Sequence, residues 1–423
     1  MCLCRKSTAI VMYSLFSDLV FYTFCAASVV QHGFWLFVFS RLAFYKEESE
    51  DFLKSEFLNP NFQKVSNFWK VDAHAVEPIS NVPILKYQNT TKPVSVVICA
   101  RNEAANLVQH LPKILNQDYP NFEVIVVNDA STDDTEWVLK NFQKTYTNLR
   151  VVNVIEKTLA GKKGALAAGI DATKHDWLLL TDADCYPLSK NWISGMMSAL
   201  ISEKIQIVFG YGPYERCDNS FLNKLIRFET LWTATQYLSF ALIKQPYMGV
   251  GRNLLYEKKL YVQANGFAAH ADLASGDDDL FVNQVVTQIN FSLFLHAETH
   301  MYSMPKTTWK SYFTQKTRHF SVGTRYLLKH KVLLGLVSMS HFLIIVTAIC
   351  LLYSNISTMF AAANVVARMC LVTFLYFKIS RRLREPMLLL WFPILDVLYV
   401  LFFIIFAPSL ILRTSSINWS RYP

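Results

Sequence analysis

Four long apolar stretches and one long polar stretch divide the chain of 423 residues. A helix that spans a bilayer needs about 20 largely apolar residues. Stretches of this kind lie within residues 19–45, 332–353, 358–377 and 387–412. The first is too long for a signal peptide, and no small-residue cleavage site follows it. The pattern therefore predicts one membrane span before the polar stretch and three spans after it.

Polar residues interrupt two of the predicted spans. Asn364 and Arg368 lie in the third stretch, which makes it the weakest of the four, and Asp396 lies in the fourth. A charged side chain in lipid is costly unless it faces protein or water. We therefore expect Asp396 to face the interior of the protein.

The polar stretch alternates between two periodicities. Short β-branched runs predict buried strands at 93–100, 122–129, 149–155, 176–184 and 205–212. Helical spacing follows each of the first four, at 102–115, 131–146, 162–173 and 190–201. Strands that alternate with helices of this length predict an α/β domain with a mostly parallel, Rossmann-like sheet and helices on both faces.

Polar side chains gather where three of these predicted strands end. They are Arg101, Asn102 and Glu103, then Asn128, Asp129 and Asp133, then Asp182 and Asp184. Turn formation explains any one of these groups. It explains poorly why three neighbouring strand ends carry acids and amides, because ligands of open α/β sheets bind at the carboxyl ends of strands. The chain has neither G-x-G-x-x-G nor G-x-x-x-x-G-K, which argues against a dinucleotide dehydrogenase and a P-loop ATPase.

The composition agrees with a membrane protein that carries a soluble domain. Hydrophobic residues make up 52% of the chain and charged residues 17%, and the net charge is +9. We attribute the positive charge to the positive-inside rule and expect no nucleic-acid partner. The basic loop 378–384 would then be cytoplasmic, and so would the polar domain, two spans away. The eight cysteines lack metal-site spacing and predict free thiols in a reducing or lipid setting.

Several motifs, in one order, give the chain a resemblance to a known family. They are ICARNEAANL, VVNDASTDDT, GKKGALAAG, TDADCYP, GVGRNLLYEK, SGDDDLF, QKTRHF and the closing INWSRYP. The chain resembles the inverting, membrane-bound glycosyltransferases of family 2, which have the A-type nucleotide-sugar fold, over roughly residues 93–323. Two positions depart from the family pattern: Gly276 replaces a Glu, and His319 replaces a Trp that helps to bind the acceptor in polymerising members.

The resemblance implies roles for the strand-end residues. Asp182 and Asp184 form a D-x-D motif that would hold Mg²⁺ or Mn²⁺, with Asp184 the direct ligand and Asp182 a ligand or a contact of the ribose. The other residues expected to bind the nucleotide-sugar donor are Arg101, Glu103, Asp129, Lys163, Gln315 and Arg318. Asp129 would accept a hydrogen bond from the base or the ribose, although it is also placed to cap the following helix. Lys162 shares with Lys163 the possibility of pairing with the diphosphate.

The remaining expected site residues concern the acceptor. Inversion needs one general base, and we expect Asp277, with Asp278 as its rival because the three consecutive Asp leave the register open. Acids at a helix N-terminus are the alternative explanation of this run. Gly251, Asn253 and His319 are expected on the acceptor side.

These observations predict a multi-pass membrane glycosyltransferase. The predicted segments are a first span in 1–45, a linker in 46–92, the catalytic domain in 93–305, an amphipathic interface segment in 306–331, three spans in 332–413 and a tail in 414–423. We expect transfer from a UDP-sugar to a lipid or lipid-linked glycan, in the inner membrane of a bacterium, with the catalytic domain in the cytoplasm. An oligomer is possible. A processive polysaccharide synthase and a non-catalytic sensor of sugar nucleotides stay open as alternatives.

Overall fold

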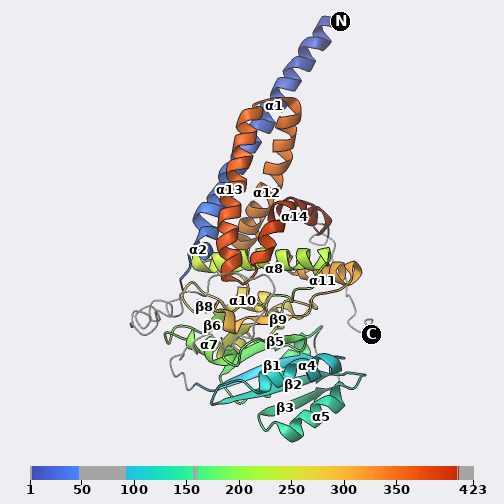
Figure 1. Ribbon diagram of the computed structural model, residues 1–423, viewed down its shortest axis with the longest axis vertical. Helices are drawn as coiled ribbons and strands as arrows, with labels where there is room; N and C mark the ends of the chain where they lie inside the picture. The colour runs from blue at the N-terminus through green and yellow to red at the C-terminus, as the bar shows by residue number, and fades with distance from the viewer. Residues whose placement is uncertain (1, 47–91, 156–158, 160, 407, 409–423) are drawn as a thin grey trace.

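The computed structural model describes residues 2–46, 92–155, 159, 161–406 and 408. Long helices form one half of the molecule and an α/β domain forms the other (Figure 1). Most of the predicted linker 46–92, the predicted tail 414–423 and the closing INWSRYP motif lie outside the described residues.

A mixed sheet of seven strands, most of its pairs parallel, forms the centre of the soluble domain. Its order is β3-β2-β1-β4-β7-β6-β8. The strands are β1 Val94–Ala100, β2 Phe122–Asp129, β3 Leu149–Val154, β4 Trp177–Asp182, β6 Ile207–Phe209, β7 Leu254–Glu257 and β8 Phe291–Leu293. All pairs from β3 to β4 and the pair β6–β8 are parallel, whereas β7 runs antiparallel to β4 and to β6. The strands β5 Cys185–Pro187 and β9 Met301–Ser303 form a second, small sheet.

The first four predicted strands are confirmed, and the fifth needs a correction. The strand within 205–212 is only three residues long, and β7 separates it from β4. The sequence pattern predicts no strand in the segment that contains β7, which the family resemblance places on the acceptor side. Three apolar residues followed by Glu257 carry too weak a pattern, and pairing with two neighbouring strands makes this segment a strand.

Helices cover both faces of the sheet. They are α4 Ala104–Leu115, α5 Thr135–Thr145, α6 Lys163–Asp171, α7 Trp192–Ser198, α9 Lys258–Gln263 and α10 Asp279–Val285, with short 3₁₀ turns at Ala268–His270 and Ala297–Thr299. Leu107 and Leu111 of α4 pack with Val96 of β1, whereas α6 packs against Val97 on the other face. This follows from the alternation of side chains along a strand. At Gly169 of α6, an added Cβ would lie 2.7 Å from Val127 and 2.8 Å from Val97, so glycine permits this close approach.

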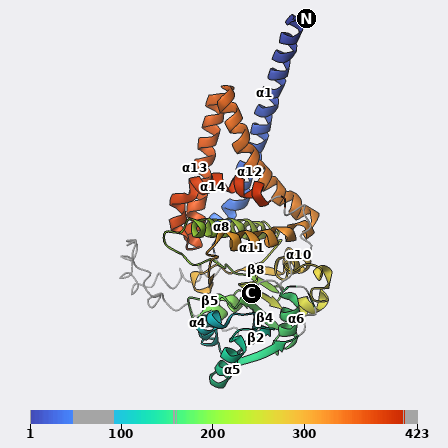
Figure 2. The same ribbon diagram turned by 90° about the vertical axis from the view of Figure 1, so that its right-hand side faces the viewer.

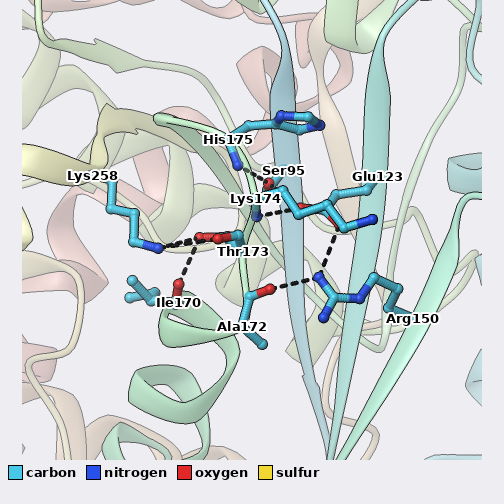
Figure 3. A network of polar contacts seen from close by, with 9 residues as sticks. All are labelled: Ser95, Glu123, Arg150, Ile170, Ala172, Thr173, Lys174, His175 and Lys258. Carbon is cyan, nitrogen blue, oxygen red and sulfur yellow. Dashed lines mark hydrogen bonds and ion pairs between the residues drawn. The ribbon is translucent and has the colours of Figure 1, made fainter.

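A polar network joins the amino-terminal ends of β1 and β2 to neighbouring loops (Figure 3). Buried Glu123 accepts hydrogen bonds from Ser95 Oγ at 2.7 Å, from the Lys174 backbone N–H at 2.7 Å and from Arg150 at 3.3 Å. Burial alone would raise the pKa of Glu123, but these donors hold it below its usual value. The network lies at the edge opposite to the strand ends that carry the predicted site.

Among the described residues, four helices are long and apolar enough to cross a membrane, as predicted. They cover Ser14–Ala43, Leu328–Ser354, Thr358–Arg382 and Pro386–Phe406. The first comprises the end of α1 Cys2–Gly33, a π-helical turn Phe34–Phe39 and α2 Ser40–Ala43; the others are α12, α13, and a 3₁₀ turn Pro386–Trp391 followed by α14 Phe392–Phe406. Arg368 of α13 donates to Asp396 of α14 at 2.7 Å, and His341 of α12 lies 3.4 Å from the same carboxylate. The charges that interrupt the predicted spans therefore pair with each other inside the bundle.

Two further helices lie between the spans and the sheet. Helix α8 Phe221–Leu242 crosses the base of the spans, and α11 Trp309–Val322 lies beside it (Figures 1 and 2). Trp232 of α8 packs against Trp35 and Phe39, so the first span is fixed to this layer. A 3₁₀ turn at Gly323–Arg325 then leads into α12.

Candidate active site

One large cavity, of about 1430 Å³, opens at the carboxyl ends of β1, β2 and β4. Most of the residues predicted from the sequence line it. They are Arg101, Glu103, Asp129, Asp182, Asp184, Gly251, Asp277, Asp278, Gln315, Arg318 and His319. The cavity continues past α8 and α11 to residues of α12 and α14, including Leu334, Gly335, Phe342 and Ile404. It therefore connects the sheet edge with the candidate membrane spans.

The D-x-D motif lies at the end of β4. Asp182 is the last residue of the strand, and Asp184 precedes β5. Ligand atoms of Asp182, Asp184 and Cys185 lie within 4.8 Å of one another. Burial and the charge of Asp182 raise the pKa of Asp184. Two carboxylates this close together are suited to hold a divalent cation between them.

Of the three side chains in this group, only the two carboxylates fit Mg²⁺ or Mn²⁺ as ligands. These ions prefer oxygen ligands. Cys185 is fully buried, and burial, with the neighbouring Asp184, raises the pKa of its thiol well above its usual value. A thiol is a soft ligand that suits these hard ions poorly, so the remaining ligands of such an ion would have to come from water or a bound phosphate.

Lys162, next to the start of α6, connects the D-x-D motif with the acidic run. Its ammonium forms an ion pair with Asp182 and lies 3.9 Å from Asp277. Burial alone would lower the pKa of Lys162, but these two carboxylates raise it well above its usual value. The cavity therefore contains a fixed positive charge beside the two aspartates.

The three consecutive aspartates have different surroundings. Asp278 caps α10 by accepting from the backbone N–H of Asp279 at 2.8 Å, and it also accepts from that of Gly251 at 2.7 Å. Asp279 accepts from the hydroxyl of Tyr326 at 2.8 Å. Within the described part of the chain, no hydrogen bond fixes the carboxylate of Asp277, which faces Lys162. Helix capping thus accounts for Asp278, whereas Asp277 makes no such bond among the described residues.

The turns after β1 and β2 are joined to each other. Asn102 and Ala130 adopt left-handed backbone conformations, with φ of 56° and 51°. Asn102 accepts from the backbone N–H of Thr132 at 2.8 Å, and its own N–H donates to Ser131 Oγ at 3.0 Å. These bonds hold Arg101, Glu103 and Asp129 at one rim of the cavity. Asp133, in contrast, accepts from the backbone of Ala104 and Thr135 and does not line the cavity.

Two residues predicted to bind ligands have structural contacts instead. The Lys163 ammonium is fully buried and donates to the carbonyls of His270, Leu273 and Ser275 at 2.6–2.9 Å. Asn253 is fully buried as well; it accepts from Trp192 and donates to the carbonyls of Tyr211 and Thr299. Neither lines the cavity. A buried polar group needs such partners, and here the protein supplies them.

Helix α11 brings the Gln-x-x-Arg motif to the cavity. Gln315 donates to the hydroxyl of Tyr214 at 3.3 Å, and Arg318 and His319 follow on the same helix. Between them, Lys316 forms a buried ion pair with Glu229 of α8. This pair connects α11 with α8 next to the motif.

Arg252 is a site residue that the sequence did not predict, although it lies between Gly251 and Asn253, which were expected there. Its guanidinium stacks on the ring of Tyr214 at 4.3 Å and donates to Ser303 Oγ at 3.1 Å and to the carbonyl of Gly212 at 2.7 Å. It lines the cavity together with Asp182 and Asp184. The sequence signal that could have identified Arg252 is its place within the glycine-rich segment GVGRNLLYEK.

Comparisons with known proteins agree with this geometry. Residues 95–263 match the model of Glycosyl transferase family 2. This part of the chain is a glycosyl transferase family 2 domain. Among curated proteins, glycosyltransferase AglE of Haloferax volcanii is 32% identical over 119 residues, which are 28% of this chain and 38% of that protein.

Two further relatives are similar over different lengths. Beta-monoglucosyldiacylglycerol synthase of Nostoc is 33% identical over 93 residues, or 22% of this chain and 20% of that protein. The probable glycosyltransferase YdaM of Bacillus subtilis is 25% identical over 243 residues, or 56% of each chain. The chain therefore matches these three relatives over 20% to 56% of their own lengths.

The family 2 domain also has a structural neighbour with the same fold. The mannosyltransferase PcManGT from Pyrobaculum calidifontis, solved in complex with GDP-Man and Mn²⁺, has a TM-score of 0.52 at 17% identity, and the likeness covers 90% of this chain and 99% of that one. The fold class predicted from the sequence, a glycosyltransferase A-type domain with flanking apolar helices, is confirmed.

Proposed function

We propose that this protein transfers a sugar, with inversion, from a nucleotide-diphosphate donor to a lipid or a lipid-linked glycan. The donor we favour is a UDP-sugar, and the metal is Mg²⁺ or Mn²⁺. One observation carries the proposal. The cavity that contains the D-x-D carboxylates, Lys162 and Asp277 continues without a break to Leu334 and Phe342 of α12.

The donor end of the cavity suits a nucleotide diphosphate. When bound by Asp182 and Asp184, a divalent ion neutralises the diphosphate leaving group. Lys162 and Arg252 add fixed positive charge near these carboxylates. Arg318 of α11 offers a planar guanidinium group that can bind phosphate oxygens. We assign Asp129 and Arg101 to the binding of the base and the ribose.

Asp277 is the residue we assign as the general base. Its carboxylate takes the proton of the acceptor hydroxyl while that oxygen forms a bond to the anomeric carbon. The bond from this carbon to the diphosphate oxygen breaks, and the nucleoside diphosphate leaves with both electrons. Because the hydroxyl attacks the face opposite to the leaving group, the configuration inverts. The Lys162 ammonium, 3.9 Å from Asp277, adds a positive charge beside this carboxylate.

The other end of the cavity suits an apolar acceptor chain. Apolar side chains of α12 and α14 line it, among them Leu334, Phe342 and Ile404. An acceptor with a lipid tail would keep the tail beside the spans and present its hydroxyl to Asp277. We place the protein in a bacterial inner membrane with this domain in the cytoplasm, because the basic residues at the end of α13 favour that side.

The test is transfer by the purified full chain in lipid nanodiscs. A panel of UDP- and GDP-sugars is offered with Mn²⁺ or Mg²⁺, or with EDTA. We expect nucleotide release that requires the metal and that Asp184→Asn and Asp277→Asn abolish. Asp272→Asn is the matched control, because Asp272 is exposed, pairs with Arg325 and does not line the cavity. Folded protein that releases no nucleotide from any donor, with lipid acceptors supplied, would contradict the proposal and favour the sensor.

A further inference from the structure

The long helix α8 is buried on almost every side, apart from three polar residues. Between Ile226 and Ala241, the partly exposed residues are Thr230, Thr233 and Gln236, and every other residue is buried. The three are spaced three residues apart, so they lie along one face of the helix. All three line the large cavity. We call them the polar stripe.

Another wall of the same cavity is mostly apolar. Residues of α12 and α14 form it, among them Leu334, Met339, Phe342 and Ile404. Helix α8 lies between the spans and the sheet (Figures 1 and 2). A lipid tail needs only apolar neighbours, and a polar side chain against such a tail loses its hydrogen bonds to water. The polar stripe therefore indicates that a hydrogen-bonding part of a ligand lies along α8, in addition to an apolar tail.

The charges along this part of α8 are balanced. In α8, which is described throughout, Glu229 is the one charged residue that lines the cavity, and it forms a buried ion pair with Lys316. An anionic headgroup beside the polar stripe would therefore meet no excess positive charge from α8. A neutral group that is rich in hydroxyls needs no such charge, but it does need hydrogen-bond partners.

The polar stripe offers mainly hydrogen-bond acceptors. Thr230 Oγ1 donates to the carbonyl of Ile226 at 2.8 Å, and Thr233 Oγ1 donates to the Glu229 carboxylate at 3.2 Å. With their hydrogen atoms in use, both hydroxyl oxygens can only accept from a ligand. The Gln236 amide can donate and accept, and it has no hydrogen-bond partner among the described residues. Sugar hydroxyls donate as well as accept, whereas an ionised phosphate only accepts.

We propose that the acceptor lipid already carries a sugar, which lies along the polar stripe while the lipid tail lies beside α12. The attacking hydroxyl then belongs to this sugar. Its oxygen forms the new bond to the anomeric carbon of the donor, its proton goes to Asp277, and the nucleoside diphosphate leaves with the electrons of the broken bond. The reaction thus extends a neutral glycolipid. This inference rests on the proposed function and names the class of its acceptor.

The experiment compares acceptors, with the purified full chain in nanodiscs of phosphatidylcholine and the donor that supports nucleotide release. Monoglucosyl and monogalactosyl diacylglycerol are each compared with diacylglycerol of the same acyl chains and with a polyprenyl monophosphate. We expect kcat/KM for at least one glycosyl lipid to exceed that for diacylglycerol at least about tenfold, because only the sugar makes the hydrogen bonds to the polar stripe.

Two variants test the polar stripe itself. Gln236→Leu and Thr230→Val each remove hydrogen-bonding groups with little change of volume, and each should reduce the ratio of kcat/KM for the glycosyl lipid to that for diacylglycerol about fivefold. A general loss of folded protein lowers both values and leaves their ratio unchanged. Thr235→Val is the matched control, because Thr235 bonds a carbonyl of its own helix as Thr230 does, but is fully buried and does not line the cavity. It should keep the wild-type ratio.

Failure of this inference differs from failure of the proposed function. If no donor releases nucleotide, the proposed transferase is wrong and the inference is overturned with it. If nucleotide is released, but diacylglycerol or the polyprenyl monophosphate is accepted as well as the glycosyl lipids, the inference alone is overturned. The same holds if both variants of the polar stripe keep the wild-type ratio.

Discussion

At the scale of single residues, two consecutive lysines at the start of α6 have opposite surroundings. Lys162 lines the large cavity between Asp182 and Asp277. Lys163 turns away from it and donates to three carbonyls of the segment 270–275. Consecutive residues on a helix point about 100° apart, so both cannot serve the same site.

Because of this difference, the same substitution, Lys to Met, should have different effects at the two positions. Lys162→Met should lower kcat/KM for the donor about 100-fold, because a fixed charge in a water-poor site is lost, and should leave the unfolding temperature nearly unchanged. Lys163→Met should instead lower the free energy of unfolding by about 2–3 kcal/mol, because buried carbonyls lose their donor. Nucleotide-release kinetics and thermal unfolding in detergent measure the two effects. The assignment is wrong if Lys163→Met affects only the kinetics.

The raised pKa of Asp279 predicts how the stability of the protein depends on pH. Burial and the neighbouring Asp278 raise its pKa to about 8, although Tyr326 donates to it. An ordinary aspartate has a pKa of 3.8. Between these values the folded state holds a proton that the unfolded state has released, so stability falls as the pH rises. Asp279→Asn should remove this slope and raise the free energy of unfolding near pH 8 by roughly 1 kcal/mol or more.

Unfolding temperatures between about pH 5 and pH 8 measure this effect. The control is Asp272→Asn, whose carboxylate is exposed and paired with Arg325. If the wild type becomes more stable than Asp279→Asn as the pH rises through this range, Asp279 is ionised in the folded state and the prediction is wrong.

The sequence was sufficient to locate the motifs but not to orient each side chain within them. GKKGALAAG indicates a lysine near the nucleotide, yet the helical phase decides that Lys162 faces the cavity. Likewise Gly251, Arg252 and Asn253 are consecutive, and only the fold turns Arg252 into the cavity and Asn253 into the core. The acids at three strand ends were predictable, because parallel strands bring their carboxyl ends to one edge.

At the scale of elements, one buried ion pair connects α11 with α8. Lys316, between Gln315 and Arg318, pairs with Glu229 of α8, and both side chains are 7% exposed. A buried pair contributes little net stability, but removing one partner leaves a costly unpaired charge. Strand β7 shows the same dependence on tertiary contacts, since its short apolar run forms a strand only between β4 and β6. Such elements escape prediction because their local pattern is weak.

The ion pair predicts a coupled pair of substitutions. Lys316→Met should lower the free energy of unfolding by about 3 kcal/mol and raise KM for the donor, because α11 loses its anchor. Adding Glu229→Leu should restore most of the stability, since the unpaired carboxylate is gone. The double-mutant cycle is measured by thermal unfolding and by donor kinetics. Additive effects of the two substitutions would contradict a direct interaction.

At the scale of the whole molecule, one cavity extends from the soluble sheet edge to the candidate spans. The four candidate spans were predictable from the length and composition of the apolar stretches. The continuity of the cavity was not predictable from the sequence, because it depends on how α8, α11 and α12 pack. The pairing of Asp396 with Arg368 also depends on packing. The sequence shows that both are charged residues within apolar stretches, but only the packing of α13 on α14 brings them together.

Gly335 provides a test of the membrane end of the cavity. It lines the cavity on α12, and a Cβ added there would meet nothing within 4 Å. Gly335→Phe should therefore fill the acceptor end without destabilising the fold. We expect transfer to a lipid acceptor to fall at least about tenfold, while nucleotide release by hydrolysis of the donor stays at the wild-type rate, because an acceptor contact is lost and the donor contacts are kept.

The matched control is Gly33→Phe. Gly33 lies in the first span, does not line the large cavity and also has open space around an added Cβ. It should leave both rates unchanged, so a general effect of a large side chain in a span is separated from a block of the cavity. If Gly335→Phe transfers sugar to lipid as fast as the wild type, the acceptor does not pass this point. The hydroxyl would then reach Asp277 from the aqueous side, and soluble glycans would be the acceptors to assay.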